Sequence, residues 1–230
     1  MNFISHLKVF AHGVFPSVYE RLERRHDKRA NQAMNKNFHL HAPAVFAAFD
    51  AAMKESHTEY WLNFGTLLGA VREHGLIPHD NDFDVSIFAA DDYSLMEQSL
   101  LRHGFTKVRQ IDLYSRCGDT GGEFTYTRDG VSIDLFKSRP NPDGTVTCHI
   151  FYDSRIGDGF RLYTKVRAVT FPFEGLMDYH FLGCSARIPS NYDAYLTSHY
   201  GNWRVPDPNW GQDGPPEEKI VAGAIGIRRE

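Results

Sequence analysis

The sequence has few cysteines and no strong excess of charge of either sign. Only three cysteines occur in 230 residues, Cys117, Cys148 and Cys184, and none belongs to a CxxC pair. This number and spacing predict neither a disulfide framework nor a four-cysteine zinc site, so we expect isolated thiols in a reducing compartment. The formal net charge of -4 offers no basic field to a phosphate backbone, and nucleic acid is therefore not expected as a partner.

A long apolar run is also missing. The first residues, MNFISHLKVFAHGVFPSVY, are weakly apolar and are interrupted by His6, Lys8 and Pro16, which predicts neither a signal peptide nor a membrane-spanning helix. We therefore expect a cytoplasmic protein. The next stretch, ERLERRHDKR, is basic, and it suits either peripheral contact with the inner face of a membrane or a solvated helix face.

The overall amino-acid composition is that of a globular protein with one hydrophobic core. Hydrophobic residues make up 42% of the chain and charged residues 23%, which excludes a disordered chain. The length suits one domain rather than two. We expect a basic helical extension at residues 1–37, a folded domain at residues 38–210, and a loosely docked tail at residues 211–230.

Apolar periodicity predicts an alternation of helices and strands. Three-and-four spacing indicates a helix from Leu40 to Met53. A short strand, YWLNF, then ends at Gly65, and Thr66 caps a helix formed by LLGAVRE. The later predicted elements are a helix over residues 92–102, strands in TVTCHIFY, VRAVTF and FLGCSARI, and a helix capped by Ser190 that ends at Tyr200.

Aspartates occupy the polar faces of two predicted strands. In DFDVSIF the alternation is strict, so Asp82 and Asp84 share one face while the apolar residues share the other. The segment EFTYTRDGVSIDLFK is a hairpin signal with Asp129-Gly130 as its turn. Its second strand carries Asp134 on the polar face, so three carboxylates reach strand faces by the same pattern.

These carboxylates suit a hard divalent cation. Two carboxylates at positions i and i+2 of a strand start roughly 6 to 7 Å apart and repel each other unless a cation lies between them. Mg2+ or Mn2+ takes oxygen ligands and keeps positions for substrate phosphates, so Asp82, Asp84 and Asp134 form a candidate metal site. The Gly65-Thr66 turn offers backbone N–H groups to a phosphate. Arg72 either adds charge to that anion or makes a salt bridge.

Neither a calcium-binding loop nor an idle surface cluster accounts well for the acidic segment. The letters DNDFD begin like a calcium-binding loop, but Val85 stands where that loop needs glycine and no glutamate ends it. A surface cluster without function does not account for the alternation with the apolar Phe83 and Val85. The pattern therefore favours a functional metal site.

Residues 64–88, FGTLLGAVREHGLIPHDNDFDVSIF, resemble the signature of the LicD/fukutin family, a branch of the nucleotidyltransferase fold. IDLF resembles the later single-aspartate strand of that family, and FPFEG and ARIPSNYDAYLTSHYGNW resemble its C-terminal pattern. The resemblance covers roughly residues 40–205. It implies an α+β fold with a nucleotidyltransferase-like mixed β-sheet flanked by helices and an acidic metal site on the strand faces.

The resemblance also implies roles for particular residues. Gly65 and Thr66 match the phosphate-binding turn, and Asp82 and Asp84 match the metal-ligand pair. Asp134 matches the third carboxylate, which either completes the metal site or accepts a proton from the attacking hydroxyl.

Other positions have less certain roles. Asp80 matches a further acidic position of the family. His79 and Asn81 depart from the family pattern, in which tryptophan and aspartate are frequent there, and both changes bear on substrate choice. Tyr200 and Trp203 near the terminal helix either stack on a base or a sugar or cap the core.

The activity implied by the resemblance is transfer of a phospho-alcohol. A CDP-linked donor would give phosphocholine, ribitol phosphate or glycerol phosphate to a hydroxyl of a glycan or cell-surface polysaccharide, with release of CMP. Two alternatives stay open. One is a nucleotidyltransferase that moves NMP from a nucleoside triphosphate and releases pyrophosphate, and the other is a non-catalytic glycan-binding partner.

Overall fold

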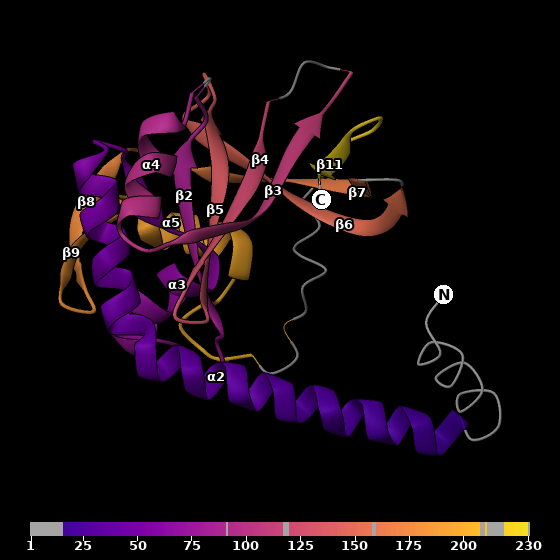
Figure 1. Ribbon diagram of the computed structural model, residues 1–230. Coiled ribbons are helices and arrows are strands. Elements are labelled where there is room, and N and C mark those ends of the chain that lie inside the picture. Colours follow the sequence, from indigo (N-terminus) through magenta and orange to yellow (C-terminus); the bar gives the residue numbers. More distant parts are fainter. Residues whose placement is uncertain are drawn as a thin grey trace.

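The computed structural model is an α+β structure in which a large β-sheet forms the centre (Figure 1). It describes residues 16–90, 92–116, 120–157, 160–207, 210 and 219–229. The helical elements are α2 (Pro16–Glu55), α3 (Phe64–Leu68), the π-helical turn η1 (Gly69–Glu73), α4 (Ser94–Arg102) and α5 (Tyr192–Tyr200). The strands are β1 (Tyr60–Leu62), β2 (Asp82–Phe88), β3 (Thr106–Tyr114), β4 (Gly122–Arg128), β5 (Val131–Pro140), β6 (Thr145–Gly157), β7 (Phe160–Pro172), β8 (Leu176–Phe181), β9 (Cys184–Pro189), β10 (Lys219–Ile220) and β11 (Ile225–Arg229).

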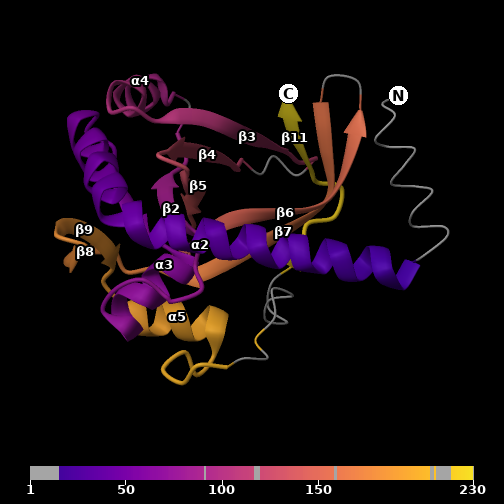
Figure 2. The same cartoon turned by 60° about the horizontal axis from the view of Figure 1, so that its bottom comes forward.

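Helix α2 combines the predicted core helix with the predicted basic extension. It runs from Pro16 to Glu55, so the expected boundary between residues 37 and 38 lies inside one helix. The apolar positions of its second half are buried as the periodicity predicts, and the Phe46 ring lies 5.1 Å from the Phe83 ring of β2. The first half of α2 projects beyond the sheet (Figures 1 and 2). None of the described helices is long and apolar enough to cross a membrane.

The acidic strand and the hairpin form as the alternation predicts. On β2, Phe83, Val85 and Ile87 are fully buried. Strands β4 and β5 pair antiparallel around a two-residue turn in which Asp129 and Gly130 have φ values of 53° and 72°. Those positive values are the ones that the favoured hairpin turn requires. Strand β2 lies parallel to β5, so the sheet is mixed, as expected.

The sheet closes on itself, a feature that the expectation of a mixed sheet flanked by helices did not include. The strands β5, β4, β3, β11, β7 and β6 are hydrogen-bonded in that order, and β6 pairs with β5 again to complete the ring. Strands β2 and β1 continue the sheet beyond β5. Strands β8 and β9 form a separate hairpin.

Strand β11 corrects the expectation of a loosely docked C-terminal tail. It pairs antiparallel with both β3 and β7. Gly226 makes the close approach possible, since a Cβ there would overlap the Phe151 ring and lie 3.0 Å from Ile111 Cγ2.

Residues 211–218 lie outside the described residues, as does Cys117. Cys148 and Cys184 are free thiols, as predicted.

Two helix caps differ from the sequence prediction. The N-cap of α3 is Asn63, whose side-chain oxygen accepts a hydrogen bond from the Phe64 N–H at 2.8 Å. Thr66 lies inside that helix, and its hydroxyl accepts the Asp84 backbone N–H at 2.8 Å. The N-cap position of α5 is Asn191 rather than Ser190. Asn63 lies directly between the end of β1 and the first residue of α3, so it occupies the cap position in place of Thr66.

Candidate active site

One row of directly opposed residues crosses β2, β5, β4 and β3. Asp84 of β2 is the register partner of Asp134, Asp134 is the partner of Thr125, and Thr125 is the partner of Arg109. A bulge in β3 between Lys107 and Arg109 brings the arginine into this row. Because directly opposed residues project from the same face of a sheet, one acidic face results.

Both carboxylate oxygens of Asp134 are held by neighbouring strands. The Thr125 hydroxyl donates to Oδ1 at 2.5 Å, and Arg109 Nη2 donates to Oδ2 at 3.0 Å. Arg109 also forms an ion pair with the buried Glu123. Burial raises the pKa of Asp134, while Arg109 and Thr125 act against that rise. Burial, followed by the charge of Asp134, raises the pKa of Glu123 to about 7.

The two strand aspartates of β2 repel each other and their neighbours. Desolvation and then the charges of Asp134 and Asp80 raise the pKa of Asp82 to about 6. Asp82 lies at the exposed start of β2. The pKa of Asp84 is raised well above its usual value by desolvation and then by Asp82, although the Gly65 N–H donates a hydrogen bond to it.

Asp80 joins the cluster through a loop that α2 holds in place. A Cβ on Gly65 would lie 3.4 Å from Asp80 Oδ2 and 3.5 Å from Asp84 Oδ2, so both oxygens flank the open side of the glycine. Asn35 of α2 donates to the backbone oxygens of Pro78 at 2.9 Å and of Asp80 at 2.8 Å. Burial raises the pKa of Asp80. The loop preceding β2 is thereby fixed against the acidic face.

The donor set suits a hard cation, with Asp82 and Asp84 as the pair that would hold it. The missing Cβ of Gly65 leaves space beside the Asp84 carboxylate, and Mg2+ commonly uses one or two carboxylates plus substrate phosphates. Among the described residues, no group of three or more His, Cys, Asp or Glu side chains is arranged so that it could hold a metal ion by itself. The carboxylate of Asp134 instead faces Thr125 and Arg109.

Without divalent metal, the protein is expected to lose stability as the pH rises from about 4 to about 7. Groups with a raised folded-state pKa favour folding below their unfolded value, and that contribution is lost as the pH passes the folded value, which is about 6 for Asp82 and about 7 for Glu123. Thermal melts in EDTA would measure this loss. Added Mg2+ should reverse it near neutral pH, and Asp84→Asn should weaken it. A melting temperature in EDTA that stays constant or rises over this range would contradict the prediction.

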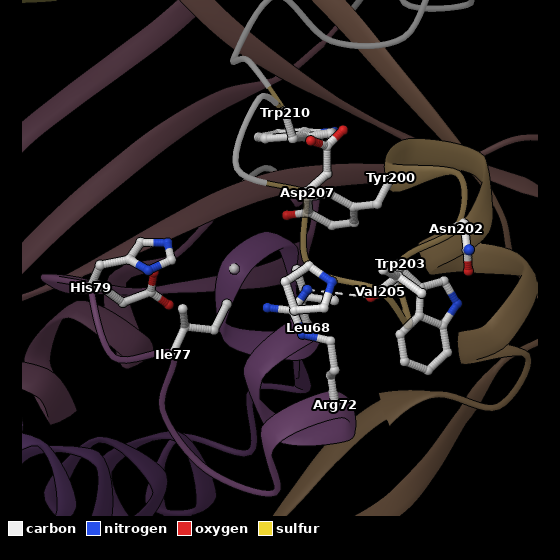
Figure 3. Close-up of a pocket in the computed structure, with 13 residues that line it drawn as sticks. Leu68, Arg72, Ile77, His79, Tyr200, Asn202, Trp203, Val205, Asp207 and Trp210 are labelled. Carbon is white, nitrogen blue, oxygen red and sulfur yellow. Dashed lines mark hydrogen bonds between the residues drawn. The ribbon is translucent and has the colours of Figure 1, made fainter.

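A cavity of about 760 Å³ opens beside the acidic face (Figure 3). It lies between the α3–η1 segment and the chain that follows α5, and Gly65 and Asp80 belong to its wall. The predicted residues Arg72, Tyr200 and Trp203 also line it. The acidic face and the cavity are therefore continuous.

The structure gives partners to several of the predicted site residues. Arg72 makes the salt bridge that was one of the two roles considered for it, with Glu73 at 2.7 Å, and it also lines the cavity. His79 lines the cavity too, and its bearing on substrate choice stays a prediction. The Gly65 N–H, predicted to bind phosphate, is directed to the Asp84 carboxylate instead. The hydroxyl of Thr66 is likewise occupied by the backbone of β2.

Sequence reasoning missed several residues of this site. Thr125 and Glu123 were identifiable, because the two-residue turn of the predicted hairpin sets the register that places Thr125 opposite Asp134. Arg109 was not, because the bulge in β3 changes its register. Trp210 stands outside any periodic segment, and no sequence signal placed it at the cavity.

Comparison with known proteins shows that the site lies within a domain for which a family model exists. A family model described as "LicD/FKTN/FKRP, nucleotidyltransferase domain" matches residues 57–191. That segment contains the whole row from Asp84 to Arg109, together with Gly65 and Asp82.

Individual relatives are similar at low identity. The ribitol-5-phosphate transferase FKTN of Mus musculus is 26% identical over 174 residues, which cover 71% of this chain and 33% of the relative. The ribitol 5-phosphate transferase FKRP of Mus musculus is 25% identical over 162 residues, covering 69% and 31%. The uncharacterized protein RT0683 of Rickettsia typhi is 29% identical over 110 residues, covering 47% and 31%. The chain thus spans about a third of the length of these relatives.

Proposed function

Because the chain belongs to the LicD/FKTN/FKRP family, we propose that it transfers a phospho-alcohol from a CDP-linked donor to a hydroxyl of a glycan or cell-surface polysaccharide, releasing CMP. The observation that carries the proposal is the acidic row of β2 and β5, which Gly65 and Asp80 connect to a cavity large enough for such a donor. Two relatives named as ribitol 5-phosphate transferases support phospho-alcohol transfer. Phosphocholine, ribitol phosphate and glycerol phosphate are the candidate groups.

The proposed roles follow from the placement of the carboxylates. Asp82 and Asp84 would hold Mg2+ or Mn2+, which supplies charge neutralisation for the donor's diphosphate when bound. Phosphoryl transfer needs mostly positioning and neutralisation of charge. Arg72 lies on the cavity wall that joins the acidic face, and its guanidinium suits a phosphate oxygen.

We assign proton acceptance from the attacking hydroxyl to Asp134. Its raised pKa brings it closer to neutral pH, where a general base works best. Thr125 and Arg109 orient its carboxylate from the neighbouring strands, as a base requires. If Asp134→Asn kept near-normal turnover while Asp82→Asn abolished it, this assignment would be wrong.

The test is CMP release from CDP-choline, CDP-ribitol and CDP-glycerol, in Mg2+ and in EDTA. Donor binding is read in the same samples by calorimetry, because transfer also needs an acceptor. Release from one donor that EDTA abolishes would name the phospho-alcohol. Binding without release would support the donor and require a panel of acceptor glycans.

The same samples distinguish the alternatives. Pyrophosphate release from a nucleoside triphosphate, with no CMP release from any CDP-alcohol, would replace the proposal by nucleotidyl transfer. Glycan binding without affinity for either nucleotide class or for divalent metal would identify a non-catalytic partner.

A further inference from the structure

The cavity differs in character between its two ends. Gly65 and Asp80 join the cavity to the acidic face. Another part of its wall, called the aromatic end below, carries the rings of Tyr200 and Trp210, which lie 4.8 Å apart with their planes tilted by 44°. Figure 3 shows Trp210 and Tyr200 together on one side of the cavity and Arg72 on the opposite side. An elongated ligand with one charged and one flat aromatic part would match this division.

The aromatic end presents a ring that the fold does not bury. Trp210 is 39% exposed, and beyond Tyr200 its ring contacts His199 at 5.6 Å. Trp203, by contrast, is 6% exposed and its indole N–H donates to Asp193 Oδ1 at 3.1 Å. Trp203 therefore caps the core, which was one of the two roles predicted for it. Trp210 is the ring with an available face.

We infer that this cavity is the nucleoside subsite of the donor, with the base stacked on Trp210 and the phosphates placed where the cavity joins the acidic face, at which a cation held by Asp82 and Asp84 would neutralise them. The inference rests on the proposed function and deepens it. Stacking on an aromatic side chain contributes about 1 to 3 kcal/mol for a base, because every base has a flat π face. The distance between the aromatic end and the acidic face is spanned by one connected cavity, so the nucleoside and the diphosphate can be bound together.

The alcohol part of the donor fits the aromatic end less well. Ribitol and glycerol have no flat face and need hydrogen-bond partners along their length, whereas much of this wall is aromatic or aliphatic, with Leu68, Ile77 and Val205. Choline is a cation that aromatic rings attract, and Asp80 and Asp207 line the cavity as well as Arg72, so choline is the alcohol that competes with the base for the aromatic rings. Ribitol and glycerol are placed on the far side of the diphosphate, toward the acceptor.

The inference is tested with CMP as the probe. Dissociation constants for CMP are measured by calorimetry with wild type, Trp210→Ala, Trp210→Phe and Tyr114→Ala, and CMP release from the CDP-alcohols is assayed with the same proteins. Trp210→Ala should weaken CMP binding at least about fivefold, as expected for a lost stacking contact. Trp210→Phe should retain most of the affinity. Tyr114 is 50% exposed on β3 and does not line the cavity, so Tyr114→Ala should bind CMP like wild type.

The outcomes separate this inference from the proposed function. If wild type binds CMP and releases it from a CDP-alcohol while Trp210→Ala binds CMP equally well, the subsite is wrong and the function stands. If Trp210→Ala weakens binding of phosphocholine, ribitol 5-phosphate or glycerol 3-phosphate and leaves CMP binding unchanged, the cavity holds the alcohol. If wild type binds neither CMP nor any CDP-alcohol, the proposed function fails, and this inference fails with it.

Discussion

Replacement of Asp82 or Asp84 by asparagine is expected to reduce CMP release by about a hundredfold to a thousandfold, the loss typical of removing one preorganised electrostatic partner of a transition state. Each substitution keeps the shape of the side chain and removes one negative charge from the pair that would hold the metal. The measurement is the initial rate of CMP release at saturating Mg2+, together with the affinity for Mn2+.

Asp129→Asn is the matched control. Asp129 lies in the β4–β5 turn with an exposed side chain and a φ of 53°, a conformation that asparagine adopts readily. The same chemical change there should leave turnover unaffected. The active-site variants should also melt at a higher temperature than wild type in EDTA, since they relieve repulsion between carboxylates whose pKa values are raised. Turnover by Asp84→Asn at the rate of Asp129→Asn would refute the assigned role.

Deletion of residues 221–230 is expected to abolish cooperative unfolding. It removes β11, leaves the facing edges of β3 and β7 without hydrogen-bond partners, and exposes Leu113 and Val166, which pack with Ala224. Unpaired edges and exposed apolar side chains favour aggregation. Soluble yield and a thermal melt would measure the effect, and a truncated protein with a wild-type melting temperature would show that closure of the sheet is dispensable.

Glycine-to-alanine substitutions test the packing of β11 in the closed sheet with a smaller change than the deletion. Gly226→Ala introduces a Cβ against Phe151 and Ile111, and overpacking of this kind costs about 1 to 3 kcal/mol of unfolding free energy. A Cβ on Gly75 meets no atom within 4 Å. Gly75→Ala should therefore melt like wild type, and equal melting temperatures for the two variants would contradict the close packing of β11.

Local pattern predicted the parts of the fold that local interactions determine. The alternation in DFDVSIF and the Asp129-Gly130 turn gave β2 and the β4–β5 hairpin correctly, because side-chain period and turn geometry act within a few residues. Closure of the sheet was missed. The five residues of β11 have weak periodicity of their own, and only their partners β3 and β7 define them as a strand.

The candidate site was predictable to a similar extent. Asp82 and Asp84 share a face because of their spacing, but the parallel register that sets Asp84 beside Asp134 joins segments distant in sequence. The contact of Arg109 with Asp134 depends on a β-bulge, and the residues at the bulge carry no sequence signal that predicts it. The aromatic end of the cavity arises where the chain after α5 returns toward α3, which is a property of the assembled fold.

The position of β11 between β3 and β7 has a consequence for the order of assembly. The β4–β5 hairpin joins neighbouring residues and can form as soon as it leaves the ribosome, whereas the ring can close only after residues 225–229 have emerged. Contacts of such high sequence separation make folding slow, because a long loop must be ordered before they form. During synthesis, the strands that carry Asp84, Asp134 and Arg109 are therefore expected to form a partly open sheet first. At this stage unpaired strand edges and apolar side chains are exposed, and binding by a chaperone would prevent aggregation.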